Sequence, residues 1–252
     1  MFFDTHCHLD DKRYDGILDA VIENMQSEGV MEACVIGADI NSSEKCLSLA
    51  EKYPFLYAVC GVHPSEVYDL DDKAFDRLTK MVKSEKCVAV GEIGLDYYSD
   101  DYDKDAQKFW FQKQLDLALG IEKPIVIHSR DACAYTMEIL TKYQKLDGVF
   151  HCFSESVETM KRVLDLGLYI GIGGVLTFKN AKNIVEVAKA CPLEKIVIET
   201  DCPYLTPHPY RGHTNTPAFI PLVAKKLAEI KNIPLSEVER VTTENAKKLY
   251  RL

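Results

Sequence analysis

Short apolar runs alternate with longer amphipathic segments along the whole chain. The runs are continuous and rich in β-branched residues, which is typical of parallel strands that are buried on both faces. Each of the eight runs is followed by a segment with helical periodicity, so the pattern predicts eight βα units. The runs occupy residues 2–5, 33–37, 56–61, 87–91, 124–127, 148–150, 168–172 and 195–199.

The segments between the runs place apolar residues at helical spacing. One such stripe predicts a helix that packs on the core through a single face, and it consists of Phe111, Leu115, Ala118 and Leu119. Asn41 with Glu44, and Ser236 with Glu239, have the spacing of a capping box. We therefore expect one helix to begin near each of these pairs.

Eight consecutive βα units predict an α/β fold of the (β/α)8 TIM-barrel type, formed by residues 1–252 as a single domain. An open doubly wound sheet is the alternative, and it would usually carry a glycine-rich phosphate loop after the first strand. Here the first run leads into His6-Cys7-His8 instead. Residues 203–221, after the eighth run, contain five of the ten prolines. We expect them to form an ordered loop over the mouth of the barrel.

Composition limits the class of protein. Hydrophobic residues make up 47% and charged residues 27% of the chain, which is typical of a globular protein and too apolar for a disordered one. No apolar stretch approaches the roughly 20 residues that a membrane span needs. The first residues lack the basic and apolar regions of a signal peptide, so we expect a cytoplasmic protein with no membrane association.

Cysteine usage and charge narrow the choice further. The nine cysteines are odd in number, scattered, and form no Cys-x-x-Cys pair, so we expect reduced thiols without disulfide partners. The net charge of −9 argues against binding nucleic acid through bulk positive charge. It does not exclude local capture of a phosphate group by metal ions.

Six histidines and carboxylates close predicted strands or follow them directly. In a barrel, catalytic groups come from the C-terminal ends of several strands, so these six should converge on one mouth. Residues two apart on a strand point to the same side, which allows His6 and His8 to bind one metal ion. The alternative is a set of buried, hydrogen-bonded histidines, which would be costly to bury without a purpose. The six are His6, His8, Glu92, His128, His151 and Asp201.

Four imidazoles and two carboxylates are too many for one tetrahedral ion. They fit two divalent ions about 3.5–4 Å apart that share a carboxylate. We assign His6, His8 and Asp201 to the first ion, and His128 and His151 to the second, with Glu92 as the bridge. Mixed imidazole and carboxylate ligands suit Zn²⁺ or Mn²⁺, and Mg²⁺ less naturally. The ion is therefore Mg²⁺, Mn²⁺ or Zn²⁺, and the sequence does not choose among them.

Six sequence blocks resemble the signatures of the TatD family of metal-dependent deoxyribonucleases, within the amidohydrolase-like barrels. The resemblance spans almost the whole chain, and the blocks together are highly specific. They are residues 2–10 (FFDTHCHLD), 61–64 (GVHP), 91–98 (GEIGLDYY), 124–132 (PIVIHSRDA), 151–154 (HCFS) and 198–205 (IETDCPYL).

The resemblance implies a TIM-type barrel that hydrolyses DNA phosphodiesters, as a 3′-to-5′ exonuclease on single-stranded or frayed 3′ ends. It also implies the same six metal ligands that the spacing indicates. Four positions depart from the family pattern, and because no ligand is lost they concern substrate preference rather than metal binding. These positions are Ala134, Glu155, His213 and Thr216.

Several residues receive roles in this hypothesis. The paired ions would lower the pKa of a bound water to give a hydroxide nucleophile, and Asp201 would accept the proton and pass it to the leaving oxygen. His63 and Arg130 are candidates for phosphate contact, with a loop histidine that bonds backbone as the alternative for His63. Tyr204 and Arg211 are candidates for stacking or phosphate contact in the loop after the eighth run. The candidates for orienting the histidines are Asp4 and Glu199.

Two other functions fit the same ligand set. The first is hydrolysis of an ester such as that of D-aminoacyl-tRNA, because an activated metal hydroxide serves both reactions. The second is a non-catalytic metal-binding protein, which the intact Asp201 makes less favourable, since a purely structural site is usually closed and needs no proton acceptor. We expect a monomer, because no helix shows an excess apolar face.

Overall fold

The computed structural model describes residues 1–252 and contains one eight-stranded sheet. The strands follow one another in the sheet in chain order, from β1 to β8, and the recorded strand pairs are parallel. This is the order predicted from the eight apolar runs. The strands are β1 (Phe2–Cys7), β2 (Val30–Ile36), β3 (Leu56–Cys60), β4 (Cys87–Asp96), β5 (Ile125–Arg130), β6 (Gly148–Phe150), β7 (Tyr169–Ile172) and β8 (Ile196–Ile198).

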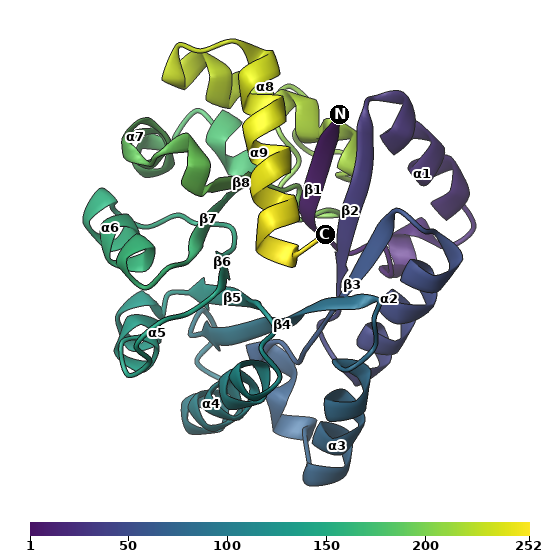
Figure 1. The fold of residues 1–252 in the computed structure, drawn as a ribbon, viewed down its shortest axis with the longest axis vertical. Helices are drawn as coiled ribbons and strands as arrows, with labels where there is room; N and C mark the ends of the chain where they lie inside the picture. The colour runs from purple at the N-terminus through teal and green to yellow at the C-terminus, as the bar shows by residue number, and fades with distance from the viewer. The chain divides into compact units, whose positions relative to one another are not determined.

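An α-helix follows every strand, and two follow the last (Figure 1). This alternation is what gives each parallel strand its crossover connection. The helices are α1 (Leu18–Ser27), α2 (Ile40–Lys52), α3 (Asp72–Met81), α4 (Lys104–Gly120), α5 (Cys133–Leu140), α6 (Val157–Asp165), α7 (Lys182–Ala190), α8 (Ile220–Lys231) and α9 (Leu235–Tyr250).

Four strands, β1, β2, β4 and β5, are longer than the sequence predicts, and β4 and β5 extend farthest beyond the C-terminal ends of their apolar runs. β4 continues to Asp96 and β5 continues to Arg130. As a result, Glu92 and His128 lie inside their strands rather than at the ends. The apolar runs stop earlier because the C-terminal halves of both strands carry polar side chains, which hydropathy alone does not assign to a strand.

Both predicted capping boxes are wrong. Helix α2 is capped by Asp39, whose side chain accepts a hydrogen bond from the Ser42 N–H in a reciprocal box. Helix α9 follows Pro234 with no side-chain cap, so Ser236 lies within its first turn. The apolar stripe on α4 is largely confirmed, although Leu119 is 37% exposed.

Contacts along the chain group into two compact units. The first unit contains Met1–Cys34, Cys152–Leu164 and Tyr169–Leu252. The second unit contains Val35–His151 and Asp165–Leu168. No helix of the structure combines the length and the hydropathy needed to cross a membrane.

Helix α9 holds the first unit together. It contacts β1 and β8, and Figure 1 shows it in yellow beside β1. The Tyr250 hydroxyl donates to the carbonyl of Thr5 at 3.0 Å, and the Asn245 side chain donates to the carbonyls of Leu193 and Ile196 at 2.8 and 2.7 Å. These buried bonds fix α9 against the strands by satisfying main-chain groups that have no access to water.

In the second unit, helix α4 is fixed to neighbouring segments in the same way, by buried side chains that bond main-chain groups. Two buried glutamines, Gln107 and Gln114, lie seven residues apart on one face of α4. Gln114 exchanges two hydrogen bonds with the main chain of Val62, and Gln107 exchanges two with the main chain of Asp96. The helix is thereby fixed to the segment after β3 and to the end of β4.

We predict that Asn245→Ala destabilises the protein by about 1–3 kcal/mol, because it leaves two buried carbonyls without their donor. The measurement is the urea midpoint of unfolding. Asn41→Ala is the matched control, because Asn41 is exposed on α2, and it should leave the midpoint unchanged. Equal midpoints for Asn245→Ala and the wild type would contradict this account of α9.

Candidate metal-binding site

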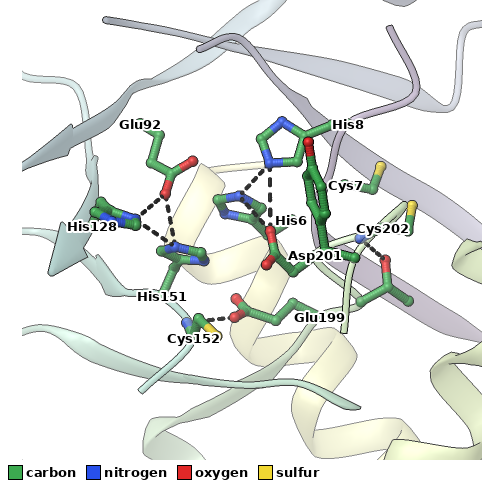
Figure 2. A network of polar contacts seen from close by, with 12 residues as sticks. His6, Cys7, His8, Glu92, His128, His151, Cys152, Glu199, Asp201 and Cys202 are labelled. Atoms are coloured by element: carbon green, nitrogen blue, oxygen red, sulfur yellow. Dashed lines mark hydrogen bonds and ion pairs between the residues drawn. The ribbon is translucent and has the colours of Figure 1, made fainter. Parts of the chain in front are cut away.

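The first unit brings His6, His8 and Asp201 together at the end of β1 and just after β8. The Asp201 carboxylate Oδ1 lies 3.6 Å from His6 Nε2 and 3.4 Å from His8 Nε2 (Figure 2). The two imidazole Nε2 atoms are 3.3 Å apart. Three donor atoms from three residues therefore face one another. His6 is fully buried, whereas His8 and Asp201 are partly accessible.

Main-chain bonds fix this cluster. The Asp201 N–H donates to the His6 carbonyl at 2.9 Å, and the His8 N–H donates to the Cys202 carbonyl at 2.8 Å. Asp201 has a φ of 55°, in the left-handed region that few non-glycine residues adopt. Such a conformation persists only where the surroundings hold it, and it is common at functional sites.

The buried carboxylate of Asp4 supports the same segment. Its Oδ1 accepts the His6 and Thr200 N–H groups at 3.2 and 3.0 Å, and its Oδ2 accepts the Thr200 hydroxyl at 2.5 Å. Burial raises the pKa of Asp4 well above its usual range and the Cys202 thiol adds to this, although the hydrogen bonds lower it. The hydrogen bond from His6 to Asp4 comes from the main chain, so Asp4 orients the His6 backbone rather than its ring.

Glu199 is a second buried carboxylate of the first unit that accepts a hydrogen bond from the main chain. It is fully buried, and its Oε1 accepts the Cys152 N–H at 2.5 Å (Figure 2). Cys152 has a φ of 44°, so this carboxylate holds a turn with left-handed backbone. The turn immediately follows His151 in the sequence.

The second unit brings Glu92, His128 and His151 together. Glu92 Oε1 lies 2.6 Å from His128 Nδ1 and 2.8 Å from His151 Nε2, and the two nitrogens are 3.4 Å apart (Figure 2). His63 lies beside this group, with its Nε2 3.9 Å from Glu92 Oε1 and its ring 4.3 Å from the His128 ring.

Strand packing determines where His128 sits. Gly94 of β4 is paired with His128 of β5. Gly94 has a φ of 149°, and a Cβ atom there would lie 1.9 Å from the His128 carbonyl oxygen. Only glycine allows this approach of the two strands, so the position of His128 requires Gly94, the second glycine of the block GEIGLDYY.

Asp96 is a site residue that the sequence analysis missed. Its Oδ2 lies 3.3 Å from His128 Nε2, and its Oδ1 accepts the Tyr98 N–H at 2.9 Å. The imidazole of His128 thus has a carboxylate at each nitrogen, Glu92 on one side and Asp96 on the other. A carboxylate behind a histidine commonly fixes its ring orientation and raises its basicity.

Charge in this group shifts two pKa values. Burial lowers the pKa of His128, but the charge of Glu92 and the hydrogen bonds with Asp96 and Glu92 outweigh it, so the pKa is raised. Burial raises the pKa of Asp96, but hydrogen bonds from His128 and the Tyr98 N–H outweigh it, so the pKa is lowered. Both shifts favour an imidazolium–carboxylate pair when no cation is present.

His63 is oriented by the residues that follow it. Its Nδ1 lies 2.7 Å from the Ser65 hydroxyl and 3.1 Å from the Ser65 N–H. The Ser65 hydroxyl in turn donates to Glu66. These bonds hold Nδ1 of His63, so Nε2 is the nitrogen that faces Glu92.

Both clusters fit a divalent cation. Each combines one carboxylate with two imidazoles, which is the ligand chemistry of Zn²⁺ and Mn²⁺ sites. In each cluster the donor atoms of different residues approach within 3.6 Å of the shared carboxylate oxygen. Of the six predicted ligands, His6, His8 and Asp201 belong to the first unit, and Glu92, His128 and His151 belong to the second.

The predicted substrate residues differ in their surroundings. The Arg130 guanidinium lies 3.7 Å from the centroid of the exposed Tyr98 ring. Arg211 donates to the Thr206 carbonyl at 3.0 Å and lies over Phe178. Tyr204 is 48% exposed, and its ring lies edge-on to the His8 ring at a centroid distance of 6.4 Å.

Comparison with known proteins gives a consistent result. A family model described as "TatD related DNase" matches residues 3–251. The chain is 41% identical over 254 residues to a metal-dependent hydrolase of Bacillus subtilis, YabD, with 100% of each chain covered. It is 35% identical over 257 residues to the metal-dependent hydrolase YcfH of Escherichia coli, covering 99% of this chain and 95% of that protein. Both relatives are named without a defined substrate.

Solved structures show the same fold. The TatD homologue YjjV of Escherichia coli superposes with a TM-score of 0.95 at 31% identity, covering 100% of this chain and 98% of that chain. A TatD-family hydrolase from Entamoeba histolytica gives a TM-score of 0.90 at 25% identity, with coverage of 99% and 97%. Together with the strand order, these matches confirm the (β/α)8 TIM-barrel prediction.

We predict that His128 of the metal-stripped protein titrates above its ordinary pKa and that Asp96→Asn lowers this pKa. Because the folded pKa is raised, the pair stabilises the fold below the ordinary histidine pKa. That contribution is lost as the pH rises through the folded pKa. Histidine ring NMR measures the titration. Asp131→Asn is the control, since Asp131 is exposed next to β5, and an unchanged pKa in Asp96→Asn would refute the pairing.

Proposed function

Because the chain belongs to the TatD family of metal-dependent hydrolases, we propose that it cleaves DNA phosphodiester bonds as a 3′-to-5′ exodeoxyribonuclease. The observation that carries the proposal is the pair of three-residue clusters, each with two imidazoles around one carboxylate oxygen. The substrates are single-stranded or frayed 3′ ends. Residues 1–252 act as one catalytic domain, and the protein works as a monomer.

We assign one divalent ion, Mg²⁺, Mn²⁺ or Zn²⁺, to each cluster. His6, His8 and Asp201 hold the first, and His128 and His151 hold the second with Glu92. When bound, such ions supply Lewis-acid activation of water and neutralise charge on the phosphate in the transition state. Glu92, the bridge in the sequence prediction, would contribute its carboxylate to holding both ions.

Asp201 is the residue that we assign to proton transfer. Its Oδ1 faces two imidazoles, and we assign the carboxylate to take the proton of the attacking water and return it to the leaving oxygen. The carboxylate is partly accessible, which lets a substrate reach it. Its main chain is fixed by the bond to His6 and its carboxylate by the contacts with His6 and His8, so the group is already positioned when the substrate binds.

His63 and Arg130 are assigned to the phosphate. The Nδ1 of His63 is held by Ser65, which orients the ring with Nε2 toward Glu92, and we assign this edge of the ring to contact with a phosphate oxygen. Arg130 ends β5, two residues beyond His128, and its guanidinium can donate two parallel hydrogen bonds to a phosphate. Both residues belong to the unit that contains Glu92.

The charge of the protein favours short substrates. A net charge of −9 gives little general attraction for a long duplex, so the affinity for DNA comes from the metal ions and the residues that we assign to the phosphate. Such binding weakens with salt and suits a strand end better than tracking along a duplex. No feature of either cluster favours the aminoacyl-ester alternative over the phosphodiester.

We predict that metal-stripped protein regains nuclease activity when Mn²⁺ or Mg²⁺ is added back. Wild-type protein should release mononucleotides from the 3′ end of a 5′-labelled single strand. Asp201→Asn should lower the rate by about 10²–10⁴, the usual contribution of a general acid–base group. His128→Ala should lower the rate and also weaken metal binding, because it removes a ligand.

The control is Asp76→Asn, an exposed carboxylate of α3 that should leave the rate unchanged. Thermal unfolding of each variant establishes that it is folded. Full activity in Asp201→Asn would contradict the assigned proton transfer. Metal-loaded, folded protein that releases no nucleotide would contradict the nuclease proposal.

A further inference from the structure

Tyr204 occupies a fixed place beside the first cluster. Its N–H donates to the Asp201 carbonyl at 2.9 Å, and its own carbonyl accepts the Asn215 side chain at 2.6 Å. Asn215 is fully buried and also donates to the Thr200 carbonyl at 2.9 Å. The turn that presents the Asp201 carboxylate therefore also sets the position of the Tyr204 ring.

A positively charged side chain, that of Arg13, lies over one face of the exposed Tyr204 ring. The Arg13 guanidinium lies 4.5 Å from the ring centroid. Arg13 belongs to a short 3-10 helix, Lys12–Tyr14, that follows β1. Asp11 caps this helix by accepting the Arg13 N–H, and the same carboxylate oxygen lies 3.5 Å from Arg13 Nε. The arginine is thus held over the ring through Nε, while its two terminal nitrogens make no hydrogen bond to the protein.

Cation–aromatic pairs are common on protein surfaces, so this pair alone does not define a site. Its location is what distinguishes it. The Tyr204 ring contacts the ring of His8, whose Nε2 lies 3.4 Å from the Asp201 carboxylate. A flat aromatic surface and a forked cation are therefore placed directly beside groups that we assign to the reaction.

We propose that Arg13 and Tyr204 bind the terminal nucleotide of the strand, the nucleotide that is released. The inference rests on the proposed nuclease function and names its nucleotide-binding subsite. The base stacks on the Tyr204–Arg13 platform, which tolerates any base because every base has a flat face. The terminal nitrogens of Arg13 pair with a phosphate of the strand, as guanidinium groups do.

Arg13 takes a role that the sequence analysis gave to Arg211. Arg211 already donates to the Thr206 carbonyl within its own loop. Arg13 lies almost two hundred positions away from Tyr204 in the sequence, so no local motif connects the two. Only the fold shows that this arginine covers the tyrosine beside Asp201.

The first test uses a pentathymidylate and the same strand with both terminal nucleotides abasic. Metal-loaded wild type should show a KM about tenfold to hundredfold higher for the abasic strand, the usual range for one base–aromatic stack, with a smaller change in kcat. Tyr204→Ala should raise the KM for pentathymidylate by a similar factor and should no longer distinguish the two strands. Tyr204→Phe should behave like the wild type, because it keeps the ring.

The matched control is Tyr210→Ala. Tyr210 lies in the same loop, is 45% exposed, and stacks on Phe219 at a centroid distance of 4.9 Å. This variant should keep the wild-type preference for pentathymidylate over the abasic strand. Equal KM values of the wild type for both strands would overturn the proposal, and so would a preference that survives in Tyr204→Ala.

The second test separates this subsite from the nuclease proposal. Fluorescence anisotropy measures binding of the two labelled strands to metal-stripped protein, where no cleavage takes place. Wild type should bind pentathymidylate more tightly than the abasic strand, and Tyr204→Ala should bind both equally. This difference without nucleotide release by the loaded enzyme would overturn the nuclease function and keep the subsite. Equal binding of both strands by the wild type would overturn the subsite.

The third test concerns the charge of Arg13. Arg13→Gln should reduce the slope of log K against log salt for pentathymidylate by about 0.7, the value for one phosphate contact on a single strand. Arg77→Gln is the control, because Arg77 is ion-paired with Glu44 at 2.7 Å in the second unit. An unchanged slope in Arg13→Gln would overturn the assigned phosphate contact.

Discussion

A buried polar group without a partner costs a few kcal/mol, so the buried carboxylates near the strand ends depend on hydrogen-bond partners inside the protein. Asp4 meets this requirement by binding the His6 main chain and Thr200, and Asp96 meets it by binding Tyr98 and His128. The same bonds that satisfy these carboxylates also orient the His6 main chain and the His128 ring. In both units, the pairing of a buried carboxylate and the positioning of a histidine therefore depend on the same hydrogen bonds.

The sequence predicts the strands well because they depend on a local pattern. Buried parallel strands need continuous apolar runs, and the six candidate donors follow five of these runs closely in the sequence. Asp96 is different, because its role arises from a contact with β5, more than thirty residues away. Hydropathy places the end of β4 before Glu92, and so it hides the carboxylate at the true end of that strand.

Buried polar residues account for most of the other differences. Asn215 and the two glutamines of α4 are nearly inaccessible, yet amide side chains are usually found on the surface. Their partners are main-chain groups of distant segments, which leave no trace in the residue pattern. The prediction of the residues that cap α2 was wrong for a similar reason. Asp39 and Ser42 satisfy the start of α2 at a spacing that other pairs in the same region also have.

The two glutamines of α4 have a consequence for the motions of the second unit. The amide protons of Val62 and Asp96 are held by the side chains of Gln114 and Gln107, not by a neighbouring strand. Their hydrogen exchange with solvent therefore requires α4 to separate from the sheet, even if the strands stay paired. These two amides would report how often the helix undocks, and hence how rigidly the strand that carries Glu92 is braced during a catalytic cycle.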